Sequence, residues 1–310
     1  MLQRPTPYLV KTSFSPAGGA APGALKAALG EVENFMLRLV KGDEAENESS
    51  IPATIRAAHY HLVSEGGRVR ARLALHAGQA LGLTPGDAVA LAATAELLHN
   101  ASLVHDDLHD REKWRRGRQT VWAVFGDEVA VCVGDLLLSA AYGALAMIRD
   151  ARHLPELIAL VHARTAMVIR GQCAELSERG RQIDDMAVYE KIAVGKSGAL
   201  LSLPLEMAFV VAGQNAWMGA ARGAAEAFGI GYQIVDDMED VEGDAGDDAG
   251  PRAVNALLVL RAAGHGSNTF EVARQIGLRH LDIAVESANR LPNGSGALLR
   301  QLALALCRRL

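Results

Sequence analysis

The sequence predicts an all-α protein, and three observations support this. Aromatic residues make up only 5% of the chain, and no segment shows the apolar–polar alternation that is typical of strands. Apolar residues instead recur at spacings of three and four over long tracts, such as 88–104 and 129–148. Prolines separate these tracts, at Pro52, Pro85, Pro155, Pro251 and Pro292. We therefore expect roughly a dozen helices joined by short connections.

The domain organisation is predicted to be simple. Residues 1–20 look like a flexible N-terminal tail. Residues 21–310 are expected to form one domain, since half of the chain is hydrophobic and a core of that size can be buried. The polar and acidic segment 42–50 is predicted to be a loop.

Charge and composition exclude several classes of protein. The formal net charge is -5, so we expect no nucleic acid partner. The three cysteines are scattered and lack metal-ligand spacing, which favours a reducing compartment. The N-terminus has no long apolar run, and no stretch of about 18 uncharged apolar residues occurs, so we expect neither a secretory signal nor a membrane span. A cytoplasmic location is predicted.

An acidic cluster follows an apolar segment in the stretch LVHDDLHDREKWRRGRQT, 103–120. On a helix, Asp106 and Asp110 share a face and Asp107 lies beside them. Carboxylates this close repel one another unless cations lie between them. The cluster alone is a weak signal, because a solvated surface helix can carry the same spacing by chance.

A second cluster strengthens the signal. The stretch GYQIVDDMEDVEGD, 231–244, places Asp236, Asp237 and Asp240 at the same spacing after another apolar segment. Two such clusters can face each other across a helical bundle. Hard oxygen ligands from two helices suit Mg²⁺, which keeps waters and binds substrate phosphates.

Seven motifs together resemble the polyprenyl synthetase family, the trans-isoprenyl diphosphate synthases with the class I isoprenoid synthase fold. In chain order they are GGRVRARL (66–73), ELLHNASLVHDDLHD (96–110), RRGRQT (115–120), GDLLLSAA (134–141), GQCAEL (171–176), KSGALL (196–201) and GYQIVDDMEDVEGD (231–244). The resemblance implies one helical bundle around a central cavity. It also implies condensation of isopentenyl diphosphate with an allylic diphosphate, and a homodimer.

The resemblance assigns roles to the clusters. Both sets of three aspartates would bind Mg²⁺, which neutralises charge on the leaving diphosphate. Arg115 would contact the allylic diphosphate, and Lys196 and Gln233 would help from the opposite side. Gln172 in the GQCAEL motif and Ser197 in the KSGALL motif are further candidates for binding the allylic substrate.

The isopentenyl diphosphate would need a cationic pocket of its own. By resemblance this pocket uses Arg70, His99 and Arg116, with Arg68 beside them; arginine suits the task because its planar fork binds phosphate oxygens in pairs. Other interpretations stay open. Arg115 and Arg116 could be a solvated helix end, and His99 could be an ordinary core histidine.

The chain departs from the family pattern at two places. The family has a lysine after its Gly-Gly pair; here that position falls on Gly67 or is deleted, unless Arg68 replaces it. Family members also have a Gly-Lys pair after the second aspartate cluster. Here no lysine follows Lys196, and Arg252 is the nearby cation. Both departures bear on rate or substrate choice and leave the aspartates intact.

Product length has one clue. Leu98, Ala101 and Ser102 lie one and two turns before Asp106, where a bulky aromatic side chain would stop elongation early. Small residues there favour geranylgeranyl diphosphate or a longer product over farnesyl diphosphate. Two other functions remain as alternatives: a class I terpene cyclase or other prenyltransferase on the same scaffold, and a non-catalytic subunit that regulates a synthase.

Overall fold

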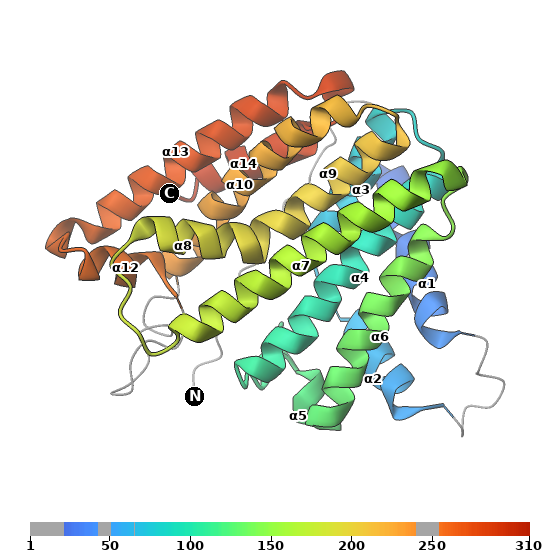
Figure 1. Cartoon of the computed structure of the whole chain (residues 1–310), viewed down its shortest axis with the longest axis horizontal. Helices are drawn as coiled ribbons and strands as arrows, with labels where there is room; N and C mark the ends of the chain where they lie inside the picture. Colours follow the sequence, from blue (N-terminus) through green and yellow to red (C-terminus); the bar gives the residue numbers. More distant parts are fainter. Residues whose placement is uncertain (1–21, 43–50, 65, 240–253) are drawn as a thin grey trace. The chain divides into compact units, whose positions relative to one another are not determined.

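The computed structural model describes residues 22–42, 51–64, 66–239 and 254–310. The predicted tail, 1–20, and nearly all of the predicted loop at 42–50 lie outside these residues. The chain forms two compact units, which meet in sequence after Ile158. Both units are built from helices, so the predicted all-α class is confirmed (Figure 1).

The first unit is centred on one long helix. Helix α4, Pro85–His109, packs against α3 and α6 and carries much of the predicted site. The helices of this unit are α1 (Pro22–Lys41), α2 (Ala53–Leu62), α3 (Val69–Ala80), α4, α5 (Val121–Phe125) and α6 (Asp127–Leu145), followed by a 3₁₀ turn, η2 (Ala151–His153). Helix α7, Leu154–Glu178, then leads into the second unit.

Local sequence explains where α4 begins and why it is buried. Thr84 is the N-cap, and its hydroxyl accepts a hydrogen bond of 3.2 Å from the backbone N–H of Asp87. Pro85 occupies the first helical turn, where its missing N–H costs nothing. The first four turns are dominated by alanine and leucine, most of them buried, so neighbouring helices can approach closely.

A short β-hairpin follows α4, where the sequence predicts no strands. Strands β1 (Trp114–Arg115) and β2 (Arg118–Gln119) pair antiparallel, with Arg115 opposite Arg118. The two turn residues, Arg116 and Gly117, have φ of 52° and 75°, as the type I′ turn of a two-residue hairpin requires. Strands of two residues are too short to produce an alternating pattern, which is why the sequence does not reveal them.

The second unit is organised around α10, Met218–Glu239, which packs against α9 and α13. Besides α10 and the rest of α7 it contains α8 (Met186–Ala193), a π-helical segment η3 (Val194–Gly198), α9 (Ala199–Val211), η4 (Asn215–Trp217), α12 (Ala256–Ala262), η5 (Gly266–Asn268), α13 (Thr269–Asn289), η6 (Pro292–Gly294) and α14 (Ala297–Cys307). Pro204 lies inside α9 rather than between helices.

The π-helical segment η3 approaches its neighbours at backbone distance. A Cβ on Gly171 of α7 would lie 2.9 Å from the carbonyl carbon of Gly195, and one on Gly229 of α10 would lie 3.0 Å from Cα of Gly198. Only glycine permits both approaches. Single π turns inside α-helices occur often at functional sites, and this one carries Lys196 and Ser197.

Two apolar stretches bear on the prediction that the chain does not span a membrane. By length and composition alone, Asp127–Leu145 and Met186–Val211 would be long and apolar enough to cross one. The second is 78% buried, as expected of a core helix, and the first is 44% buried. The absence of a membrane span therefore stays a prediction.

Candidate active site

The first aspartate cluster lies at the C-terminal end of α4. Asp106 is half-buried, Asp110 is exposed and caps the helix, and the side chain of Asp107 is only 2% exposed. Nε of Arg115 donates a hydrogen bond of 2.6 Å to Oδ1 of Asp107. Burial raises the pKa of Asp107 to about 6, although Arg115 acts in the opposite direction. The three carboxylates therefore have different environments despite their regular spacing.

Four of the predicted phosphate-binding residues come together in the first unit. Burial lowers the pKa of His99 well below its ordinary value, and the positive charges of Arg70, Arg116 and Arg115 lower it further. These residues come from α3, α4 and the hairpin. We call Arg70, His99, Arg115 and Arg116 the cationic group.

Arg68 has a different environment. It is the N-cap of α3, with φ of 45°. Its Nε donates to Oε1 of Glu33 at 2.9 Å, and its Nη2 donates to the backbone oxygen of Leu62 at 2.6 Å. These bonds tie the start of α3 to α1 and α2. The role of Arg68 in substrate binding stays a prediction.

The second aspartate cluster is described only in part. Asp236 and Asp237 lie in the last turn of α10, whereas Asp240 lies outside the described residues, as do Asp244 and Arg252. Asp236 is half-buried. Asp237 is 3% exposed, and its Oδ2 accepts a hydrogen bond of 2.8 Å from the backbone N–H of Ala256. Its carboxylate therefore fixes the start of α12.

Hydrogen bonds connect the π-helical segment to α10. Ser197 Oγ donates to Oε1 of Gln233 at 3.4 Å, and Gln233 Nε2 donates to Oδ1 of Asp237 at 3.0 Å. Lys196 forms an ion pair with Glu175 of α7. Three predicted residues of the allylic site, Lys196, Ser197 and Gln233, are thus held within one unit.

Gln172 lies three residues before Glu175 on α7. It is 8% exposed, and neither polar atom of its side chain has a hydrogen-bond partner among the described residues. A buried amide without partners is unusual and needs an explanation. A ligand, or a residue beyond those described, would provide the missing bonds.

The donors present fit Mg²⁺ shared with a substrate better than a metal enclosed by protein. Within the described ranges, no three His, Cys, Asp or Glu side chains gather closely enough to hold a metal ion. Mg²⁺ is usually bound through one or two carboxylates together with waters and substrate phosphates. Asp106 and Asp110 at the end of α4, and separately Asp236 on α10, match that pattern, and Asp107 and Asp237 also accept the hydrogen bonds described above.

One histidine beside the cationic group is not predicted from the sequence. His61 of α2 is 7% exposed, and Arg115, Arg116 and Arg68 act on its charge. In the sequence nothing distinguishes it from the exposed His59 on the same helix. Only the packing of α2 against the rest of the unit separates the two.

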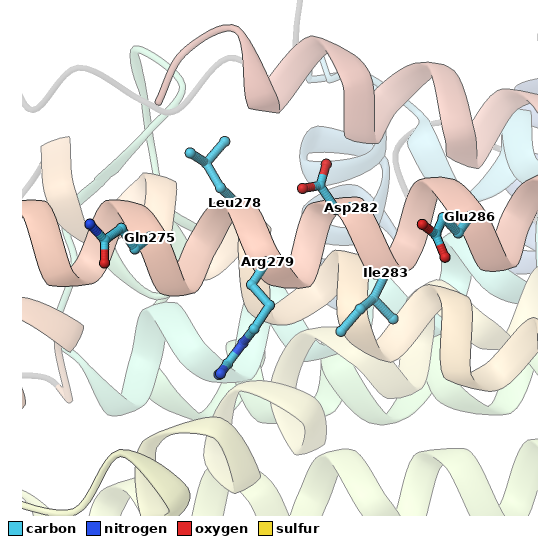
Figure 2. A pocket seen from close by; sticks show the side chains of 6 residues that line it. All are labelled: Gln275, Leu278, Arg279, Asp282, Ile283 and Glu286. Carbon is cyan, nitrogen blue, oxygen red and sulfur yellow. The ribbon is translucent and has the colours of Figure 1, made fainter.

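A shallow depression of about 430 Å³ lies elsewhere, on α13. Figure 2 shows the six side chains that line it, all from this helix: Gln275, Leu278, Arg279, Asp282, Ile283 and Glu286. None of them is a predicted site residue, so this depression does not mark the predicted site.

Comparison with solved structures gives the class of fold. The chain resembles a decaprenyl diphosphate synthase from Rhodobacter capsulatus with a TM-score of 0.78 and 22% identity, covering 93% of this chain and 97% of the other. An FPP/GFPP synthase from Zymomonas mobilis gives a TM-score of 0.75 and 25% identity, covering 92% and 100% of the two chains. The fold is that of the helical isoprenoid synthases.

Comparison of sequences gives the family. The family model for polyprenyl synthetase matches residues 52–252. The chain therefore belongs to the polyprenyl synthetase family, as its motifs predict.

The curated relatives differ in the product that they are named for. A (2E,6E)-farnesyl diphosphate synthase from Mycobacterium tuberculosis is 37% identical over 182 residues, covering 56% of this chain and 48% of the relative. An all-trans-nonaprenyl-diphosphate synthase (geranyl-diphosphate specific) from Rhodobacter capsulatus is 34% identical, covering 64% and 61%. The chain thus spans about half the length of the first curated relatives it matches.

Proposed function

We propose that this protein is a prenyl diphosphate synthase that joins isopentenyl diphosphate to an allylic diphosphate. In this reaction the allylic C–O bond breaks and a new C–C bond forms to the isopentenyl unit. A proton is lost, and diphosphate leaves. The observation that supports the proposal best is the cationic group, because Arg70, His99 and Arg116 lie near the Arg115–Asp107 pair at the end of α4.

The cationic group has the chemistry of a diphosphate site. Arg70, Arg116 and His99 would bind isopentenyl diphosphate without a metal, using the paired donors of the guanidinium groups. Arg115, held by Asp107, would contact the allylic diphosphate. Because these side chains are half-buried, their interaction with phosphate is stronger than it would be in water.

The carboxylates are the proposed metal ligands. We expect Asp106, Asp110 and Asp236 to bind Mg²⁺ directly, together with Asp240 beyond the described residues. Asp107 and Asp237 are the remaining members of the two proposed sets, and each also holds a neighbouring group in place. When bound, Mg²⁺ supplies positive charge that stabilises the leaving diphosphate.

Lys196, Ser197 and Gln233 are further proposed ligands of the allylic diphosphate. Lys196 and Ser197 project from the π-helical segment, and Gln233 is oriented by its bond to Asp237. Gln172, with both polar atoms lacking partners among the described residues, is an additional donor for this site. The role of each residue is to bind and orient the diphosphate while the C–O bond breaks.

Product length is the finer part of the proposal. The relatives range by name from farnesyl to nonaprenyl diphosphate synthases, so they do not select one length. Ala101 is small and buried, and the half-buried Ser102 turns its hydroxyl back to the carbonyl of His99 at 2.8 Å. Neither is a bulky barrier, which supports a geranylgeranyl or longer product. A cytoplasmic homodimer completes the proposal, and light scattering would measure its mass.

A product assay tests the proposed function. The purified protein receives Mg²⁺, labelled isopentenyl diphosphate and, separately, dimethylallyl, geranyl, farnesyl or geranylgeranyl diphosphate, and the products are separated by chain length. We expect elongation to geranylgeranyl diphosphate or beyond. Metal-dependent release of diphosphate without elongation would instead indicate a cyclase or another prenyltransferase. Inactivity with every primer would favour the regulatory subunit.

A further inference from the structure

His61 is a buried polar residue that the mechanism above does not use. It lies in the last turn of α2 and is 7% exposed. Its Nε2 has no hydrogen-bond partner among the residues that the structure describes. Buried polar groups in native proteins nearly always have partners, so this imidazole needs an explanation.

The surroundings of His61 identify what kind of partner it lacks. The positive charges of Arg115, Arg116 and Arg68 all act on its ring. His61 in turn acts on His99, so it adjoins the cationic group. Guanidinium groups are donors only and cannot accept a hydrogen bond from an imidazole N–H. An anion with several acceptor oxygens would satisfy the imidazole and the guanidinium groups together.

Asn100 provides an orienting contact. It follows His99 on α4 and is 1% exposed, and its Nδ2 donates to the backbone oxygen of Glu96 at 2.7 Å. Oδ1 of the same side chain has no partner within the described ranges. The Asn100 side chain favours the protonated form of His61. In the protonated form, which the negative charge of a bound anion would favour, one ring N–H can point to Asn100 while the other faces the ligand.

The hairpin turn brings a guanidinium group close to the same place. A Cβ on Gly66, five residues after His61, would collide with Nη1 of Arg116. Arg116 has φ of 52°, which the type I′ turn requires and which costs a non-glycine residue free energy. The turn thus holds the end of Arg116 against the backbone that follows α2.

We propose that His61 is a further ligand of isopentenyl diphosphate, donating a hydrogen bond from its imidazole to a diphosphate oxygen beside Arg70, His99 and Arg116. This inference rests on the proposed function. It also bears on the departure at Gly67, because the sequence has no lysine between Lys41 and Lys113. The family's lysine would supply a hydrogen-bond donor to this pocket. In this chain an imidazole donor from α2 would supply one instead.

Three variants of the full chain test this assignment. His61→Leu removes the donor at similar volume, His61→Gln keeps an N–H donor, and His59→Leu changes the exposed histidine of the same helix. We expect His61→Leu to raise KM for isopentenyl diphosphate by about 10- to 100-fold, as expected for a hydrogen bond to a charged group. KM for the allylic substrate should change less than about twofold, since Arg115 and the metal ligands are untouched. His61→Gln should restore part of the loss, and His59→Leu should match the wild type.

Calorimetry with inorganic pyrophosphate separates this inference from the proposed function. If the wild type elongates no primer, the proposed function fails, yet pyrophosphate binding that weakens in His61→Leu would still establish His61 as an anion ligand. An unchanged KM and an unchanged pyrophosphate affinity in His61→Leu would overturn the inference. Equal increases in both KM values, not relieved in His61→Gln, would show that His61 acts through packing. Circular dichroism of each variant checks that the fold is retained, and His61→Gln serves if the leucine variant does not fold.

Discussion

Asp107 and Arg115 form a hydrogen-bonded ion pair of 2.6 Å, in which the carboxylate is 2% exposed and the guanidinium 31% exposed. The pair joins the end of α4 to the first strand of the hairpin. It explains why acidic and basic residues lie so close in the sequence here. One carboxylate of the cluster positions an arginine, while Asp106 is half-buried and Asp110 is exposed.

The first prediction concerns this pair. Burial raises the pKa of Asp107 to about 6, so the cost of burying its charge offsets much of the attraction to Arg115. Asp107→Asn should therefore change the free energy of unfolding by less than about 1 kcal/mol. Arg115 loses its charged partner, and KM for the allylic substrate should rise about tenfold. The control is Asp127→Asn, which breaks the exposed pair with Arg111 and should leave KM unchanged. Loss of stability without any change in KM would contradict this account.

The proposed metal ligands give the second prediction. Asp106→Ala and Asp236→Ala should each lower Mg²⁺-dependent turnover by at least about 100-fold, because each removes a carboxylate that would bind the metal. Neither residue is fully buried, so the helical circular dichroism should be unchanged. Asp184→Ala, at an exposed position in the second unit, is the control and should retain activity. Near-normal turnover in either site variant would refute the assigned roles.

Gly66 gives a prediction that separates binding from stability. In Gly66→Ala the new Cβ would collide with Nη1 of Arg116, and the guanidinium would have to move. The end of a flexible side chain can move at little cost, so the urea midpoint should stay close to that of the wild type. KM for isopentenyl diphosphate should rise about tenfold, since a displaced guanidinium loses a charged hydrogen bond. Gly86→Ala is the matched control, because no described atom lies within 4 Å of its Cβ position. An unchanged KM in Gly66→Ala would argue against a role for Arg116 in this pocket.

A buried charge network in the second unit gives a prediction about stability alone. Glu206 is 0% exposed and accepts two hydrogen bonds from Arg164, at 2.7 and 2.6 Å, and one from Ser202 at 2.9 Å. Glu206→Gln would leave Arg164 without its charged partner and should lower the free energy of unfolding by about 3 kcal/mol. Glu271→Gln, which breaks an exposed pair with Arg274, should cost less than about 1 kcal/mol. Equal effects in urea unfolding would show that burial of the network contributes little.

The pH dependence of stability tests the environment of His61. Burial and the nearby arginines lower the pKa of His61 to about 3, whereas the unfolded chain protonates it near pH 6.5. The unfolded state then binds more protons between these values, so the free energy of unfolding falls as the pH drops from about 6.5 toward 3. His61 should contribute up to about 1.4 kcal/mol per pH unit to this slope. Urea unfolding at pH 7, 6, 5 and 4 should show a shallower dependence in His61→Gln. Parallel curves for the two proteins would contradict a buried, neutral His61.

The sequence predicts the all-α fold class, but it does not predict every element of secondary structure. The repeated spacing of apolar residues predicts helices because burial of one face requires it, and the tract at 88–104 does lie in α4. The hairpin and the π-helical segment have no such signal. Arg116 adopts a positive φ that arginine rarely takes, and the π turn at Lys196 follows from the approach of glycines on α7 and α10.

The sequence predicts a set of candidate site residues, but it does not predict the different environments that the structure gives them. Spacing correctly places the first three aspartates at one helix end, yet it treats them as equivalent. In each cluster one aspartate differs from the others because of a tertiary neighbour. Arg115 of the hairpin donates a hydrogen bond to Asp107, and the backbone N–H of Ala256 in α12 donates one to Asp237. His61 is missed for the same reason, since only packing shows that it adjoins the cationic group.

If this chain elongates an allylic diphosphate, the stoichiometry of the reaction is the most direct measurement of that activity. Labelled isopentenyl units incorporated and diphosphate released would be counted in the same reaction, with and without Mg²⁺. The account predicts one diphosphate released for each unit incorporated, and neither product in the absence of the metal. Diphosphate release without incorporation, or no turnover with any allylic primer, would contradict it.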